Sequence, residues 1–94
     1  MTIKWNMGKT FYILQSKKNG SFYVGSSDDL NRRILEHNSG QTKSTKTGQP
    51  WKVVFSYDFD NSNAGLSAEL RVKALKSRKI IEKVINGFIK ISDL

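Results

Sequence analysis

Residues 10–25 read TFYILQSKKNGSFYVG, in which two short runs rich in aromatic and β-branched residues flank a polar connection. The connection, Lys17-Lys18-Asn19-Gly20, ends in Asn-Gly, a pair that favours tight turns between antiparallel strands. The sequence therefore predicts a β-hairpin with strands over residues 10–16 and 21–25.

Counting along this hairpin predicts which side chains share a face. A connection of two or four residues pairs even positions of the first strand with odd positions of the second, so Tyr12 and Tyr23 lie on one face. The opposite face is wholly apolar and is expected to be buried; it carries Phe11, Ile13, Phe22 and Val24. The tyrosine face is amphipathic, and we expect it to be available for chemistry.

A helix is predicted directly after the hairpin. Ser26-Ser27-Asp28-Asp29 supplies N-cap and first-turn residues for a helix that runs to about Asn38 and is followed by Gly40. Its expected inward side chains are Leu30, Ile34 and Leu35. Residues 41–49 contain lysines and hydroxyl side chains but no large apolar side chain, which predicts a mobile basic loop.

A third strand and two more helices complete the predicted fold. Pro50 precedes a stretch, Trp51 to Tyr57, in which Trp51, Val53, Phe55 and Tyr57 occupy alternate positions as in a strand. Residues 58–63 are turn-like. Helical periodicity then appears in two groups, Leu66, Leu70, Val72 and Leu75 in a helix from Ala64, and Ile81, Val84, Ile85 and Phe88 in a helix capped by Gly87.

The predicted order is strand, strand, helix, strand, helix, helix. This is an α/β fold with a small three-stranded, mainly antiparallel sheet flanked by helices. Ninety-four residues suffice for one hydrophobic core, so we expect a single domain over residues 1–94.

The composition limits which binding partners and which metal ions the protein could have. A formal charge of +8 favours a polyanionic partner, although basic residues also serve solubility alone. With no cysteine and one histidine, thiolate and multi-histidine sites are excluded, so a metal would have oxygen ligands and would be Mg²⁺ or Mn²⁺. No stretch approaches 18 apolar residues and residues 1–9 lack the apolar core of a signal peptide, so no membrane association and a cytoplasmic location are expected.

The hairpin, the following helix and a late glutamate together resemble the GIY-YIG nuclease superfamily, which includes phage homing endonucleases and an excision-repair nuclease subunit. Tyr12 and Tyr23 stand eleven positions apart, in Thr10-Phe11-Tyr12 and Tyr23-Val24-Gly25. Thr10 replaces the glycine of the first family motif. The other matching positions are Arg33 and His37, one turn apart on the predicted helix, and Glu69 on the helix after the third strand. The run looks most like small, bacterial, single-domain members, with Asn86 as a tentative counterpart of the family's late asparagine.

The resemblance implies a metal-dependent endonuclease that hydrolyses DNA phosphodiester bonds in repair, recombination or processing. It implies that Tyr12 positions or deprotonates the attacking water, that Tyr23 and Arg33 hold the phosphate, that His37 supports them, and that Glu69 holds the metal. Alternatives for the single residues are surface tyrosines, an Arg33–Asp29 pair, a local hydrogen bond of His37, and a Glu69–Lys73 surface ion pair.

Basic side chains outside these motifs are expected to contact backbone phosphates without reading sequence. They are Lys43, Lys46, Arg71, Lys73, Lys76, Arg78, Lys79 and Lys83. Two other functions account for the same charge. One is a binding module that keeps the nuclease scaffold without turnover, and the other is a basic RNA-binding domain unrelated to nucleases, which leaves the ordered motif spacings unexplained.

Overall fold

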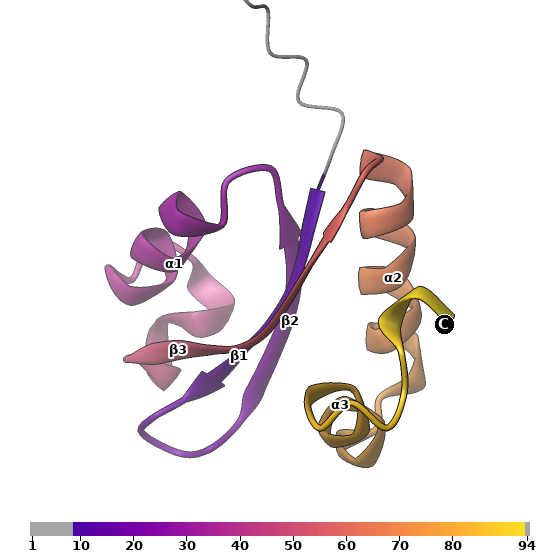
Figure 1. Cartoon of the computed structure of the whole chain (residues 1–94). Coiled ribbons are helices and arrows are strands. Elements are labelled where there is room, and N and C mark those ends of the chain that lie inside the picture. The colour runs from indigo at the N-terminus through magenta and orange to yellow at the C-terminus, as the bar shows by residue number, and fades with distance from the viewer. Residues whose placement is uncertain (1–8, 94) are drawn as a thin grey trace, which may run out of the picture.

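A three-stranded antiparallel sheet separates two groups of helices in the computed structural model, which describes residues 9–93. In Figure 1, α1 and the 3-10 helix η1 cover one face of the sheet, and α2 and α3 cover the other. The elements are β1 (Lys9–Ser16), β2 (Phe22–Ser27), α1 (Leu30–Asn38), η1 (Lys43–Gly48), β3 (Trp51–Phe59), α2 (Ser62–Leu75), α3 (Arg78–Ile85) and η2 (Ile91–Asp93). The predicted fold class and element order are confirmed; the expectation about residues 1–9 falls almost entirely outside the described residues.

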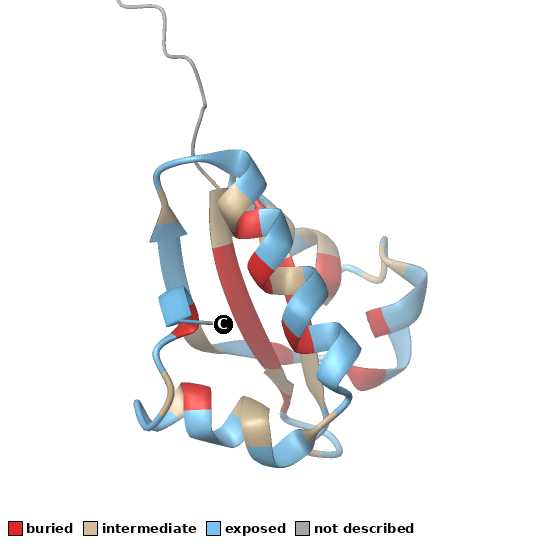
Figure 2. Cartoon of the chain, turned by 90° about the vertical axis from the view of Figure 1, so that its right-hand side faces the viewer, coloured by how far each residue is buried: buried red, intermediate tan, exposed pale blue. Residues whose placement is uncertain are grey.

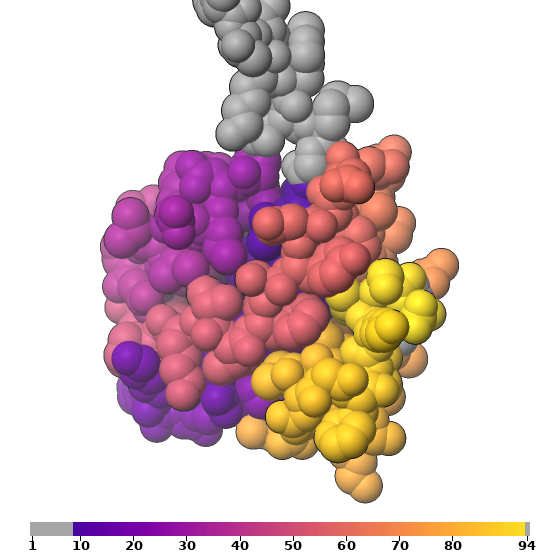
Figure 3. Space-filling view, viewed as in Figure 1, coloured from indigo at the N-terminus to yellow at the C-terminus, as the bar shows by residue number. Residues whose placement is uncertain are grey.

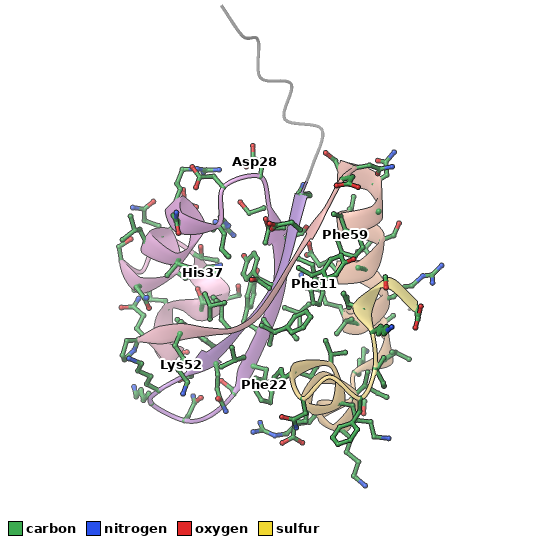
Figure 4. The ribbon with its side chains drawn as sticks, in the orientation of Figure 1. Phe11, Phe22, Asp28, His37, Lys52 and Phe59 are labelled. Atoms are coloured by element: carbon green, nitrogen blue, oxygen red, sulfur yellow. The ribbon has the colours of Figure 1, made fainter. Side chains whose placement is uncertain are left out.

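The side chains of the hairpin lie on the faces that were predicted for them. β1 is the central strand, and its register places Tyr12 opposite Gly25 and Leu14 opposite Tyr23, so the two tyrosines share a face. On the other face Phe11 and Ile13 pack into the core formed with α2 and α3. Figure 4 shows Phe11 and His37 on opposite sides of the sheet.

The tyrosine face, which was expected to be available for chemistry, is largely covered by α1 and η1. Tyr12 is only 1% exposed and forms a second core cluster with Leu14 and Trp51. Leu30 and Ile34 of α1 pack onto this cluster as predicted, but Leu35 is 71% exposed and points away from it. Residues 30 and 34 are one turn apart, whereas residue 35 projects about 100° further round the helix.

In β3 the alternation of side chains between the two faces of the sheet is interrupted. Ile13 pairs with Phe55 but Leu14 pairs with Val53, so a bulge lies between them and Val54 is the extra residue. Trp51 consequently packs on the tyrosine face, whereas Phe55 packs on the α2 and α3 face. The alternate positions Trp51 and Phe55 therefore do not share a face, because the bulge shifts the period-2 pattern by one residue.

The segment predicted as a mobile basic loop is instead the 3-10 helix η1, in which Thr45 and Gly48 are buried. The indole N–H of Trp51 donates to the Thr45 carbonyl at 2.7 Å, and the Ser16 hydroxyl donates to the Gly48 carbonyl at 2.6 Å. Small polar residues are therefore buried here by hydrogen bonds rather than by apolar packing, which hydrophobic periodicity does not detect.

Helix α2 packs through small residues. Its buried residues are Gly65, Ala68 and Val72, and Figure 2 shows red segments interrupting the pale blue along this helix. A Cβ on Gly65 would lie 2.8 Å from the Cβ of Lys9, so the helix approaches β1 closely only because glycine stands there. Three leucines of the predicted helical pattern, Leu66, Leu70 and Leu75, are exposed, because the small-residue face rather than the leucines packs against the sheet.

The segment predicted as turn-like, residues 58–63, is shorter in the structure. Strand β3 extends to Phe59 and α2 begins at Ser62, with the Asn61 side chain accepting from the Ala64 N–H at 2.9 Å as its N-cap.

Helix α3 buries Val84, with Ile81 and Ile85 packed around it as predicted, and Gly87 follows its C-cap with φ 81°. Phe88 lies beyond the helix end and is 80% exposed, contrary to the prediction. In Figure 3, β3 crosses the surface between α1 and the C-terminal segment, consistent with its place at one edge of the sheet. Among the described residues, no helix has both the length and the apolar composition needed to cross a bilayer.

Candidate active site

The five residues matched to the nuclease motifs come from four elements and meet beside β2. Tyr12 lies on β1, Tyr23 on β2, Arg33 and His37 on α1, and Glu69 on α2. Because β2 is an edge strand, side chains from the helix on each face reach past it toward one another.

The phenol of Tyr12 lies directly over the backbone of β2. A Cβ on Gly25 would come within 2.5 Å of the Tyr12 hydroxyl oxygen, closer than such contacts occur. The glycine of Tyr23-Val24-Gly25 is therefore required by the close approach of a side chain from the neighbouring strand.

His37 is fully buried and uses both ring nitrogens. Its Nε2 lies 3.0 Å from the Tyr12 hydroxyl, and its Nδ1 lies 2.7 Å from the Thr45 hydroxyl. The Thr45 hydroxyl donates to the Thr42 carbonyl at 3.3 Å, so its oxygen accepts from Nδ1–H and leaves Nε2 to accept from Tyr12. In this arrangement Tyr12 donates its hydrogen to His37, and its oxygen faces the Arg33 guanidinium.

Burial shifts both titrating groups toward their neutral forms. It raises the pKa of Tyr12 above 10.0, and the neighbouring Arg33 guanidinium, which favours the phenolate, offsets only part of this effect. Burial also lowers the pKa of His37 below 6.5, and the positive charge of Arg33 lowers it further. The protein alone thus holds a neutral phenol against a neutral imidazole.

Tyr23 is half-buried and lies at the junction of the two helices. Its ring centroid is 4.8 Å from that of His37 and 6.5 Å from that of Tyr12, and the Lys73 ammonium lies 5.5 Å from it. The Tyr23 hydroxyl makes no hydrogen bond within residues 9–93, so it is free to bind a ligand.

Arg33 is oriented by its own helix. Its Nη1 donates to the Glu36 carboxylate at 2.6 Å and to the Thr42 hydroxyl at 3.4 Å. Arg32, rather than Arg33, makes the ion pairs with Asp28 and Asp29 at the start of α1. The remaining N–H groups of Arg33 keep the planar donor pattern that suits phosphate oxygens.

Glu69 is held on both carboxylate oxygens. Ser26 on β2 donates to Oε1, and Lys73 donates to Oε2 at 2.6 Å, so the ion pair with Lys73 is present. The Glu69 side chain is nevertheless only 15% exposed.

The oxygen donors at this point suit Mg²⁺ or Mn²⁺. Within residues 9–93 there is no group of three or more His, Cys, Asp or Glu side chains that could hold a metal. A metal here would therefore have Glu69 as its carboxylate, with the Ser26 hydroxyl beside it and water or phosphate oxygens as further ligands. Mg²⁺ in proteins commonly has such an incomplete set of protein ligands.

The other predicted residues lie around this cluster or apart from it. The guanidinium of Arg78 lies 4.5 Å from the Phe22 ring and donates to the Gly20 carbonyl, so it flanks β2 at the hairpin end. Asn86 ends α3 and lines a shallow depression on that helix, away from the tyrosines, together with Lys79, Glu82, Lys83 and Phe88. Of the remaining cations, Lys43 and Lys46 lie on η1, Arg71 is exposed on α2, and Lys76 forms the C-cap of α2.

Three residues of the cluster have no counterpart in the motif analysis: Ser26, Glu36 and Thr45. Strand parity places Ser26 on the α2 side with Val24, and helix spacing places Glu36 three positions after Arg33, so both were accessible to sequence reasoning. Thr45 carries no such signal, because its contact with His37 depends on how η1 folds back onto α1.

Comparison with known proteins agrees with this geometry. Residues 8–82 match the GIY-YIG catalytic domain family. The chain is 32% identical to a UPF0213 protein of Staphylococcus saprophyticus over 86% of its own length and all of the relative's. It is 34% identical to the UPF0213 protein YazA of Bacillus subtilis over 73% of its own length and 70% of the relative's.

A solved structure gives the same assignment. The solution NMR structure of a UPF0213 protein from Bacillus halodurans is 34% identical and superposes with a TM-score of 0.56, covering 85% of this chain and 84% of that one. The chain therefore belongs to the GIY-YIG catalytic domain family, among the small UPF0213 proteins.

Proposed function

We propose that this protein is a divalent-metal-dependent endonuclease that hydrolyses phosphodiester bonds in DNA, as part of DNA repair, recombination or processing in the cytoplasm. The observation that carries the proposal is the contact series Tyr12–His37–Tyr23 beside Arg33 and the Ser26-bound Glu69. A structural core would not need a buried phenol, a buried imidazole, a guanidinium and a carboxylate at one strand edge.

One group of side chains orients the attacking water, and another binds the phosphate. Tyr12, fixed by its hydrogen bond to His37, offers a phenol oxygen that orients an attacking water. The free hydroxyl of Tyr23 and the unused N–H groups of Arg33 bind the scissile phosphate. As negative charge accumulates on that phosphate in the transition state, the fixed Arg33 cation stabilises it more than the ground state.

The neutral state of Tyr12 supports a role for a metal in this proposal. Burial raises the pKa of this phenol, so it is a weak base at neutral pH without a further cation. A divalent ion held by Glu69 would supply that charge, polarise the phosphate and stabilise the leaving oxygen. Glu69 and Ser26 are the residues that would hold it.

The test is cleavage of supercoiled, branched and single-stranded DNA by the purified protein, with and without Mg²⁺ or Mn²⁺. We expect metal-dependent cleavage that Glu69→Gln abolishes while DNA binding persists, because the change removes the ligand charge but keeps size and helix propensity. Glu82→Gln is the matched control, since Glu82 is exposed on α3, and it should cleave as the parent does.

Two results would decide against the proposal. If no substrate is cut by folded protein that still binds DNA, the chain is a binding module on a nuclease scaffold. If Glu69→Gln cuts as fast as the parent, Glu69 is only the surface partner of Lys73.

A further inference from the structure

Lys73 occupies an unusual position for one partner of a helical i,i+4 ion pair. Its ammonium donates to Glu69 at 2.6 Å and at the same time lies 5.5 Å from the ring centroid of Tyr23. The Lys73 side chain is 43% exposed whereas that of Glu69 is 15% exposed. Exposed pairs of this kind contribute little to stability, but here the carboxylate is largely removed from water and lies in the candidate active site.

The two hydrogen bonds of Glu69 occupy both of its carboxylate oxygens. Ser26 is a neutral donor that can rotate and present its oxygen instead, whereas the Lys73 ammonium is a full positive charge. A divalent cation that binds this carboxylate must approach within a few ångströms of that ammonium. This separation is shorter than the screening length at physiological salt, so the repulsion is not screened away.

We propose that Lys73 is an internal counter-ion that occupies the metal-binding carboxylate and is displaced when a divalent cation binds. The inference rests on the proposed function, in which Glu69 is the metal ligand. The displaced ammonium remains beside Tyr23, whose hydroxyl is free. The Lys73 ammonium therefore lies where a substrate phosphate would bind.

This exchange links metal and DNA through one side chain. A phosphate that binds the Lys73 ammonium draws it from Glu69 and thereby strengthens metal binding, and by thermodynamic reciprocity the metal strengthens the phosphate contact to the same extent. Without DNA, Lys73 keeps the metal affinity of the free protein low.

The test is Mn²⁺ binding to the full chain without DNA, followed by the electron paramagnetic resonance signal of free Mn²⁺. Lys73→Met removes the charge but keeps the length of the side chain, and its thioether still packs on the Tyr23 ring. We expect the dissociation constant for Mn²⁺ to fall about tenfold.

The matched control is Arg71→Met on the same helix. Arg71 is exposed and makes no ion pair within residues 9–93, and residues two apart on a helix do not face each other. It loses the same unit of charge, yet we expect its dissociation constant to change by about twofold or less. Lys73→Gln should reproduce the result of Lys73→Met, which guards against a folding defect of one variant.

Glu69→Gln separates the two proposals. If it abolishes Mn²⁺ binding while Lys73→Met and Arg71→Met behave alike, the metal site stands and the counter-ion role is overturned. If Glu69→Gln binds Mn²⁺ as the parent does, the ligand assignment in the proposed function is wrong, and the role of Lys73 is overturned with it.

Discussion

Burial controls the protonation of His37. Tyr12, Tyr23 and Thr45 pack around this ring and exclude water, and the cation Arg33 opposes a positive charge on it. Glu36 favours the charged form, but burial and Arg33 prevail and lower the pKa below 6.5. The folded protein thus binds a proton on His37 less readily than the unfolded chain does.

This difference predicts how stability depends on pH. Below about pH 6.5 the unfolded chain takes up a proton on His37 that the folded protein does not, so the free energy of unfolding falls as pH falls. His37 is the single histidine of the chain, and the lowered pKa of Glu36 affects stability only below pH 4.5. The change in the free energy of unfolding just below pH 6.5 is therefore assigned to His37. Urea unfolding at pH 7.5 and 5.5 measures the effect.

His37→Gln is the control for this measurement. Its free energy of unfolding should change little between the two pH values, because no group with a pKa near 6.5 remains. Equal losses of stability in the parent and in His37→Gln would contradict the account.

At the scale of the elements, η1 is the support of the buried imidazole. Its Thr45 is fully buried, and the Thr45 hydroxyl joins His37 of α1 to the Thr42 carbonyl at the start of η1. Trp51 of β3 in turn donates to the Thr45 carbonyl, so three elements meet at this residue. The orientation of the Tyr12 phenol therefore depends on η1 through the His37–Thr45 hydrogen bond.

We predict that Thr45→Val lowers the free energy of unfolding by about 1–3 kcal/mol, because a side chain of equal shape leaves buried polar partners without a hydrogen bond. Urea denaturation measures the change. Thr47→Val is the matched control, since Thr47 is exposed on the same helix and its substitution should stay within about 0.5 kcal/mol. Equal effects of the two variants would show that the Thr45 hydroxyl does not support His37.

At the scale of the whole molecule, a net charge of +8 on 94 residues favours association with a polyanion. Lys73 and Arg78 flank β2 beside the aromatic rings of Tyr23 and Phe22, and other cations lie on η1 and α3. These cations are distributed over three elements, η1, α2 and α3, rather than gathered on one. The charge distribution therefore suits phosphate contacts more than sequence recognition.

We predict that DNA affinity falls steeply with salt. The logarithm of the binding constant should decrease linearly with the logarithm of salt concentration, with a slope of about 0.9 per phosphate contacted. Fluorescence anisotropy of a labelled duplex between low and physiological salt measures this slope without added metal. Two duplexes of unrelated sequence should bind alike, and an affinity that ignores salt or depends strongly on sequence would contradict phosphate-dominated binding.

Local rules acting on the sequence determined the hairpin, the shared face of Tyr12 and Tyr23, the order of the elements and the helical spacing of Arg33 and His37. Each of these depends on residues close together in the chain, through turn chemistry, strand parity or helix repeat. The resemblance to the GIY-YIG family also implied that Glu69 belongs with the tyrosines, although α2 lies on the other face of the sheet.

Only the tertiary structure decided what covers these elements. The bulge at Val54 divides β3 between two cores, and the close contact of Gly65 with Lys9 turns the leucines of α2 outward. Thr45 is buried under His37 by hydrogen bonds that no periodicity reveals. These features depend on residues distant in the chain, whose packing overrides local hydrophobic pattern, and they determine that Tyr12 is a buried neutral phenol rather than an exposed one.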